Sequence, residues 1–375
     1  MGSESHSQHG HRRSAMGLVL LMLLLPLSHI HVTKLEQSQS VQSSNSQPWD
    51  DRGQPWGQYG GGATRNGSMP IHNATSGNVL SIDDPVLNWV ALDDGIGSDA
   101  YGSIIGNFSG SLTVSPGAIE RCTPSALFAV ILHESTSTST TKLSLFAGDD
   151  AALSWQVELG DTRAARSTPV LVDVNLDGRT EIIIVYDTDS SLQVDVWSPE
   201  LFCDESGWQV SGHANELLWS WTNADYRIGV TSPHFQTRQS NHLSVTQPLL
   251  ADLELDGQPE LVLTVVDSTT DDPHILSIPL GANTPTENWD VTLDRGTHPS
   301  DPAWAQLDAQ NSVVVATTID ENSGNMWIWR IDGSTGSNDW GRLAIAGTDT
   351  DSDAPRLRLP SPVIAQLDTD DAPEM

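Results

Sequence analysis

Short runs in which apolar and polar residues alternate recur along the chain from about residue 81 onward. Five of these runs contain a tryptophan near their start, and each is followed by a polar connection and further short apolar runs. Alternation with a period of two is typical of half-buried strands, and no stretch keeps apolar residues at helical spacing. The pattern therefore predicts an all-β chain of four-stranded units with few helices. The tryptophans that open the units are Trp89, Trp155, Trp221, Trp289 and Trp340.

An acidic loop separates two apolar runs in the unit that follows Trp155. Oxygen-bearing residues occupy alternate positions of this loop, and Gly178 permits a sharp turn. Alternate side chains of a tight loop can surround Ca²⁺, which takes six to eight oxygen ligands. An EF-hand is excluded because its position 12 would be Ile184 and because strand-like runs flank the loop. The candidate ligands are Asp173, Asn175, Asp177, the backbone carbonyl of Arg179, and Glu181.

The same pattern returns twice further along the chain. The second loop keeps the full pattern, whereas the third has Gln366 in place of the first acid and Asp371 in place of the glycine. The units around Gln306 and Tyr101 lack the acidic pattern, so we expect two calcium sites, a degenerate third and two units without metal. The alternative is that the loops are solvated turns that bind nothing, because Asp, Asn and Gly favour turns. The further candidate ligands are Asp252, Glu254, Asp256, Gln258 and Glu260 in the second loop, and Asp368, Asp370 and Glu374 in the third.

These residues carry a family resemblance. The unit of a proline, a strand, Asp-x-Asn/Asp-x-Asp-Gly-x-x-Glu and a second strand resembles the FG-GAP/VCBS repeat, as in the propeller of integrin α subunits. The unit Ile328–Gly336 followed by Trp340 is similar to repeats of propellers that bind pyrroloquinoline quinone (PQQ). The resemblance covers roughly residues 85–375 and implies a calcium-stabilised extracellular β-propeller. On this pattern the chain holds four complete blades and a fifth that is cut short, which predicts an N-terminal piece of a longer protein.

The N-terminal region differs in composition from the repeats. Arg12 and Arg13 precede an apolar run of about 13 residues, which suits an export signal and is short for a membrane span. We therefore expect a signal peptide at 1–33, a flexible Ser/Gln/Gly-rich linker at 34–80, and the propeller at 81–375. Cys122 and Cys203 are the two cysteines, and the sequence leaves open whether they pair or remain thiols.

The net charge of −32 limits the classes of partner. Nucleic acids and anionic membranes bind through clustered Lys and Arg, and the chain has 17 of these against 49 Asp and Glu. We find no G-x-S-x-G, H-E-x-x-H, P-loop or G-x-G-x-x-G motif, so no catalytic residue is predicted. The leading hypothesis is a secreted or cell-surface binding, adhesion or structural module whose propeller face binds a protein or glycan. The alternative is the non-catalytic part of a propeller enzyme, a PQQ-type dehydrogenase or a polysaccharide lyase, whose site lies in missing sequence.

Overall fold

The structure is a computed structural model of the chain. It describes residues 96–118, 122, 127–135, 140–148, 152–159, 167–188, 190–210, 216–230, 244–281, 285–320, 323–346 and 361–364. All of these belong to the second of the two units into which the chain divides, Gln47–Met375. The predicted signal peptide and linker, the strand at Trp89 and the third acidic loop lie outside the described residues.

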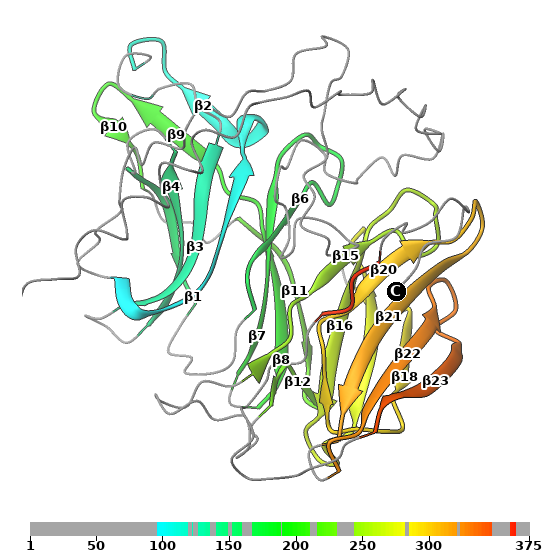
Figure 1. Ribbon diagram of the computed structural model, residues 1–375. Helices are drawn as coiled ribbons and strands as arrows, with labels where there is room; N and C mark the ends of the chain where they lie inside the picture. The colour runs from blue at the N-terminus through cyan, green and yellow to red at the C-terminus, as the bar shows by residue number, and fades with distance from the viewer. Residues whose placement is uncertain are drawn as a thin grey trace, which may run out of the picture. The chain divides into compact units, whose positions relative to one another are not determined.

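Four larger antiparallel sheets follow one another along the described part of the chain, as the colours of Figure 1 show. The first sheet contains β1 (Ile96–Asn107), β3 (Leu127–Ser135), β4 (Thr141–Ala147) and β5 (Leu153–Glu158). The second contains β6 (Val170–Val172), β7 (Glu181–Asp187), β8 (Leu192–Trp197) and β11 (Leu217–Asn223). The third contains β15 (Leu249–Ala251), β16 (Glu260–Asp267), β17 (Pro273–Pro279), β18 (Trp289–Thr292) and the short β12 (Tyr226–Arg227). The fourth contains β20 (Ala303–Gln306), β21 (Ser312–Ile319), β22 (Met326–Asp332), β23 (Asn338–Ile345) and the short β19 (His298–Pro299).

The remaining elements are short. A 3₁₀ turn, η2 (Ser109–Ser111), is the one helical element of the described residues, in agreement with the expectation of an all-β chain. No helix in the described ranges is long and apolar enough to span a membrane. The small strands are β2 (Leu112–Val114), β9 (Leu201–Asp204) and β10 (Gly207–Trp208), which form one sheet, and β13 (Gly229–Val230) and β14 (Ser244–Val245), which form a pair.

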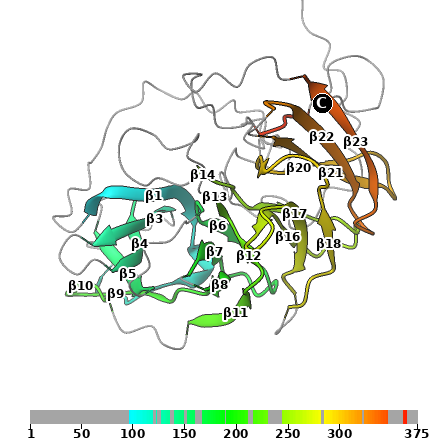
Figure 2. The same cartoon turned by 90° about the horizontal axis from the view of Figure 1, so that it is seen from below.

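The grouping of strands corrects one prediction. The sequence pattern assigned each tryptophan strand to the strands that follow it, but the structure pairs it with the strand that precedes it. Trp155 lies opposite Leu145 of β4, and Trp289 lies opposite Ser277 of β17. The tryptophan strand is therefore the outer strand that ends a sheet, seen in Figure 2 for β5, β11 and β18. Alternation of polarity identifies a strand but carries no information about its hydrogen-bonded neighbour.

The core lies between successive sheets. The middle strands β7 and β16 are apolar along nearly their whole length, as expected of strands that are covered on both faces. Ile182 and Ile184 belong to an apolar cluster shared with the first sheet, whereas Ile183 and Val185 belong to one shared with the third and fourth sheets. The second sheet is thus buried on both faces, because alternate side chains of a strand point to opposite faces.

Hydrogen bonds join the starts of the first strands of successive sheets. The backbone N–H of Thr168 donates to Oε1 of Gln247 at 2.7 Å, and the N–H of Gln247 donates to Oδ1 of Asp301 at 2.6 Å. The hydroxyl of Ser361 donates to Oδ2 of Asp301 at 2.7 Å. Each of these residues stands directly before a proline, so we call them the pre-proline belt. The belt places the starts of β6, β15 and β20 and the segment at residues 361–364 side by side.

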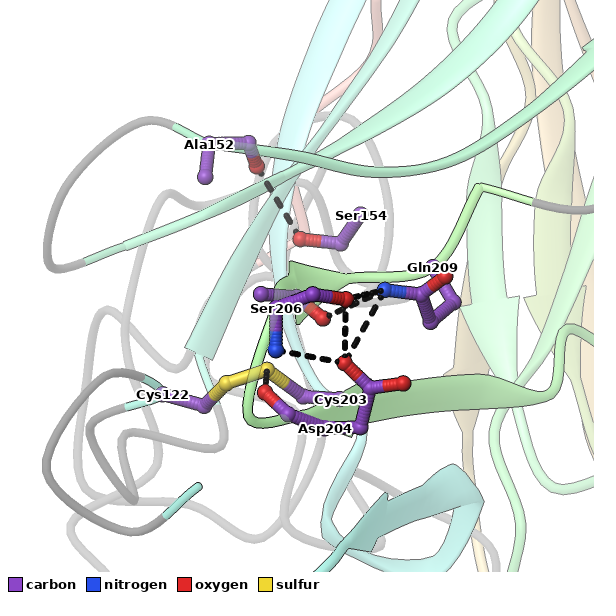
Figure 3. The surroundings of a disulfide bond; sticks show 8 residues. Cys122, Ala152, Ser154, Cys203, Asp204, Ser206 and Gln209 are labelled. Atoms are coloured by element: carbon purple, nitrogen blue, oxygen red, sulfur yellow. Dashed lines mark hydrogen bonds between the residues drawn. A yellow bond between two sulfur atoms is a disulfide. The ribbon is translucent and has the colours of Figure 1, made fainter. Parts of the chain in front are cut away.

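A disulfide and a parallel strand pair link the first sheet to the second. β2 follows β1 along the chain, β9 follows β8, and the two run parallel with Leu112 opposite Leu201. Cys122 and Cys203 form a disulfide with a Cα–Cα distance of 6.4 Å, so the two cysteines pair (Figure 3). Both are buried beside Ala118. In the hairpin after Cys203, the carboxylate of Asp204 accepts hydrogen bonds from the N–H of Ser206 and from the amide of Gln209.

Candidate metal centre

The first acidic loop, Asp173–Glu181, connects β6 to β7, and it wraps around the side chain of Asp173. Oδ1 of Asp173 accepts the backbone N–H of Asp177 at 3.1 Å, and Oδ2 accepts that of Gly178 at 2.9 Å. Gly178 has a left-handed φ of +87°, and Leu176 has a φ of +60°, which is costly for a residue with a side chain. The bonds to Asp173 hold this tight loop closed.

The middle of the first loop is ordered by its own polar side chains. Oδ1 of Asn175 accepts the N–H of Asp177 at 3.0 Å, and Nδ2 of Asn175 donates to Oδ2 of Asp177 at 3.1 Å. Oδ1 of Asp177 accepts the N–H of Arg179 at 2.8 Å. The guanidinium of Arg179 pairs with exposed Glu200 at 2.9 Å. The structure therefore brings Asp173, Asn175 and Asp177 together within one hydrogen-bonded turn.

Glu181 closes the loop from inside the protein. Its side chain is fully buried; Oε2 accepts the N–H of Val174 at 2.9 Å and Oε1 accepts the hydroxyl of Ser198 at 2.9 Å. Burial raises the pKa of Glu181 to about 7, because a charged carboxylate loses its hydration there. The negative charges of Asp177 and Asp173 raise this pKa further, while the two hydrogen bonds lower it.

The second acidic loop, Asp252–Glu260, repeats this geometry between β15 and β16. Asp252 accepts the N–H groups of Asp256 and Gly257, both at 2.9 Å, and Glu260 accepts that of Leu253 at 2.7 Å. The left-handed positions also recur, with φ of +57° at Leu255 and +88° at Gly257. Burial raises the pKa of Glu260 to about 8, with further contributions from Asp252, Glu254 and Asp256.

The other predicted positions in the second loop lie nearer the solvent. Oδ1 of Asp256 accepts the N–H of Gln258 at 2.8 Å, as Asp177 does with Arg179 in the first loop. Glu254 and Gln258 are exposed. Asp368, Asp370 and Glu374 of the third loop lie outside the described residues.

The donor chemistry of the two loops suits a hard cation. Every candidate ligand is an oxygen of a carboxylate, an amide or a backbone carbonyl, the set that Ca²⁺ and Mg²⁺ prefer over softer metals. A carboxylate has about four lone-pair positions, so an oxygen that accepts one N–H can still bind a cation. In the described residues no group of three or more His, Cys, Asp or Glu side chains converges on one point as a metal site. The carboxylates are turned toward the N–H groups of their own loop instead.

The corresponding turn between β20 and β21 is closed differently. Asp308 accepts the N–H groups of Gln310 at 2.8 Å and of Asn311 at 2.9 Å, and the side-chain amide of Asn311 donates to both of its oxygens. These hydrogen bonds, that of Gln310 first, lower the pKa of Asp308. Ser312 stands where the acidic loops have their buried Glu, and its hydroxyl donates to the carbonyl of Leu253 at 2.6 Å.

Neighbouring residues that the sequence pattern did not single out hold the first loop in place. Ser198 lies 17 positions after Glu181 and joins it from the end of β8. The hydroxyl of Thr180 donates to the carbonyl of Asn107 at 2.7 Å, and Gly110 of η2 lies directly against the backbone of Gly178. Gly110, which stands between two serines, and Ser198 have no motif around them that could have indicated these contacts.

Comparison with known proteins assigns the chain to no family. No protein-family model matches it, and no curated protein matches it. Among solved structures, a rhamnogalacturonan lyase of Bacillus licheniformis is 13% identical with a TM-score of 0.37, over 65% of this chain and 51% of the lyase. The exotype rhamnogalacturonan lyase YesX is 13% identical with a TM-score of 0.36, over 67% of this chain and 50% of the lyase. The quinohemoprotein alcohol dehydrogenase ADHIIG of Pseudomonas putida HK5 is 11% identical with a TM-score of 0.33, over 60% of this chain and 35% of the enzyme.

The chain spans about half the length of the two lyases and about a third of the dehydrogenase. A likeness at these TM-scores carries no argument about fold or activity. The resemblance of the acidic loops to FG-GAP/VCBS repeats therefore stays a prediction.

Proposed function

We propose that the chain is an exported β-propeller module whose acidic loops bind structural calcium and whose propeller face binds a protein or glycan outside the cell. The observation that carries the metal part is the repeated geometry of the loops Asp173–Glu181 and Asp252–Glu260. Their sequences differ at four of nine positions. They nevertheless share the hydrogen bonds to the first Asp, the two left-handed residues and the buried Glu.

The contacts between sheets support the propeller part of the proposal. In a propeller the first strands of all blades start beside one axis and the sheets pack face to face around it. The pre-proline belt joins the starts of β6 and β15 and then of β15 and β20. The second sheet shares one apolar cluster with the first sheet and another with the third. Both features are expected of neighbouring blades and support the proposal.

Calcium would act on the charge of these loops. Asp173 and Asp177 lie close enough to Glu181 to raise its pKa, in a chain whose net charge is −32. A bound divalent cation would offset this repulsion and favour the folded state by mass action. Oxygens of Asp173, Asn175, Asp177, Arg179 and Glu181 would hold one ion, and those of Asp252, Glu254, Asp256, Gln258 and Glu260 a second. Asp368, Asp370 and Glu374 would contribute to a degenerate third site.

The disulfide supports the proposal that the protein is exported. Disulfides form and persist in oxidising compartments and are rare in the cytosol. The pairing of Cys122 with Cys203 therefore agrees with the predicted signal peptide at 1–33. An extracellular location also supplies the millimolar calcium at which sites of modest affinity are filled.

The test is thermal unfolding of the protein without its signal peptide, in a calcium titration and again with EDTA. We expect the Tm to rise with calcium and to fall with chelator, and we expect the double variant Asp173→Ala plus Asp177→Ala to lose about half of the rise. Asp308→Ala is the matched control, because Asp308 also accepts backbone N–H groups in a turn between two strands but lies outside the acidic loops. A wild-type Tm that does not respond to calcium would overturn the proposed metal sites.

A further inference from the structure

The backbone of the first acidic loop lies directly against the turn η2, which follows β1 of the first sheet. Gly110, in the 3₁₀ turn η2, lies so close to Gly178 that a Cβ built on Gly110 would be 1.7 Å from the carbonyl oxygen of Gly178. The same Cβ would be 2.6 Å from the carbonyl carbon of Gly178 and 3.2 Å from Cα of Arg179. Backbone atoms cannot swing aside as the end of a side chain can, so only glycine fits at position 110.

The contact falls at the part of the loop that would carry a ligand. Gly178 donates its N–H to Asp173. The next residue along the chain, Arg179, supplies the backbone carbonyl that is a candidate ligand. One residue further on, the hydroxyl of Thr180 donates to the carbonyl of Asn107 at 2.7 Å. Two contacts therefore tie positions 6 and 8 of the loop to η2 and to the end of β1 respectively.

The surface against which the loop rests is itself well anchored. Phe108 is fully buried and packs edge-on against Phe128 of β3, with ring centroids 5.8 Å apart. The N–H of Ser111 donates to the carbonyl of Phe108 at 3.0 Å, which closes the turn around Gly110. A displacement of η2 would therefore disturb the core of the first sheet.

We propose that Gly110 and Thr180 are positioning residues for calcium in the first acidic loop, and that the ion couples this loop to the packing of the first sheet on the second. The inference rests on the proposed function. The first sheet would hold the loop backbone in the shape that binds calcium. By thermodynamic linkage, bound calcium would stabilise the contact between the loop and η2. The turn at Asn107–Ser111 would then be more protected in the calcium-bound protein than in the calcium-free protein.

The chain offers a matched pair of glycine variants for the test. Gly110→Ala forces a methyl group into the backbone of Gly178, whereas Gly117→Ala meets only the side chain of exposed Glu205, which can move. Thr180→Val removes the hydroxyl that donates to Asn107 and keeps the size of the side chain. None of these changes removes a candidate oxygen ligand.

The measurement is isothermal titration with calcium, combined with hydrogen exchange of the amides of residues 107–112 with and without calcium. We expect Gly110→Ala and Thr180→Val to weaken one calcium-binding step about tenfold, as loss of an outer-shell partner does at metal sites. We expect Gly117→Ala to leave both steps unchanged, and calcium to slow exchange at residues 107–112 in the wild type. If Gly110→Ala does not fold, Thr180→Val carries the test.

The outcomes separate this inference from the proposed function. If the wild type gives no binding heat with calcium, the proposed function fails and the inference fails with it. If the wild type binds calcium but Thr180→Val and any folded Gly110→Ala protein bind it with wild-type affinity, only the coupling is wrong. A merely structural role would lower the Tm of the variants equally with and without calcium and would leave the affinity unchanged, which would also refute the coupling.

Discussion

Glu181 and Glu260 are buried carboxyl groups at the ends of loops whose central residues include exposed ones. Their pKa values are raised from 4.5 to about 7 and about 8 respectively, chiefly by burial. Between pH 4.5 and these values the folded protein binds more protons than the unfolded chain. The free energy of unfolding then falls as pH rises, because loss of the proton costs more free energy in the folded protein than in the unfolded chain.

The pH dependence of stability is therefore a prediction at the scale of single residues. With EDTA present, we expect stability in urea to fall as pH rises from about 5 to 8, and Glu260→Gln to flatten the upper part of this profile. Glu200→Gln is the control, because Glu200 is exposed. A metal-free wild type whose stability stays constant or rises over this range would contradict the prediction.

The sequence located the residues of the first two acidic loops because their positions follow from a local repeat. Asp173 and Glu181 stand eight residues apart in one turn, so spacing alone brings them together. It did not predict Ser198, which bonds to Glu181 from the end of β8, or Gly110, which meets Gly178 from another sheet. Such contacts depend on how sheets pack, and one sequence contains no periodic signal for that.

At the scale of elements, the strand runs were predicted well where both faces are buried. β7, β16 and β21 are continuous apolar segments bounded by turn residues, and the structure places them in the middle of their sheets. The short strands β2, β9 and β10 were not predicted, because two to four residues are too few to show alternation. The wrong partner assigned to the tryptophan strands has the same origin, since hydrogen-bond pairing is not encoded in polarity.

Two turn glycines give a prediction about how elements meet. Gly178 and Gly336 both have positive φ, +87° and +67°, but nothing lies within 4 Å of a Cβ at Gly178. A Cβ at Gly336 would be 2.6 Å from the indole of Trp289 in the neighbouring sheet. We expect Gly178→Ala to lower the free energy of unfolding by about 1 kcal/mol, from the backbone alone. Gly336→Ala should lower it by about 3 kcal/mol, because overpacking is added.

The measurement for this pair is urea unfolding of both variants in the presence of EDTA, which removes any contribution of metal at the first loop. The difference between the two variants reports on the contact between β18 and the turn that joins β22 to β23. Equal losses in the two proteins would show that Trp289 does not press on this turn in solution.

At the scale of the whole molecule, the pre-proline belt predicts that Asp301 holds the sheets together. Asp301 is 3% exposed, and its two oxygens accept hydrogen bonds from Gln247 and Ser361. We expect Asp301→Ala to lower the free energy of unfolding by about 3 kcal/mol, since it leaves a buried N–H without its acceptor. Asp301→Asn should lose less, because its carbonyl oxygen can still accept the N–H of Gln247.

Chemical denaturation followed by tryptophan fluorescence and by circular dichroism would measure these losses. Asp308→Ala serves again as the exposed control. If Asp301→Ala and Asp308→Ala lose the same stability, the belt does not hold the sheets together.

The disulfide between Cys122 and Cys203 has a consequence for the covalent connectivity of the chain. The bond joins residues 81 positions apart, and the connection between them includes all of β3 to β8. A protease that cuts this chain once between the two cysteines produces two polypeptides that remain one molecule until a reductant is added. The first and second sheets would thus stay covalently tethered after a single backbone break.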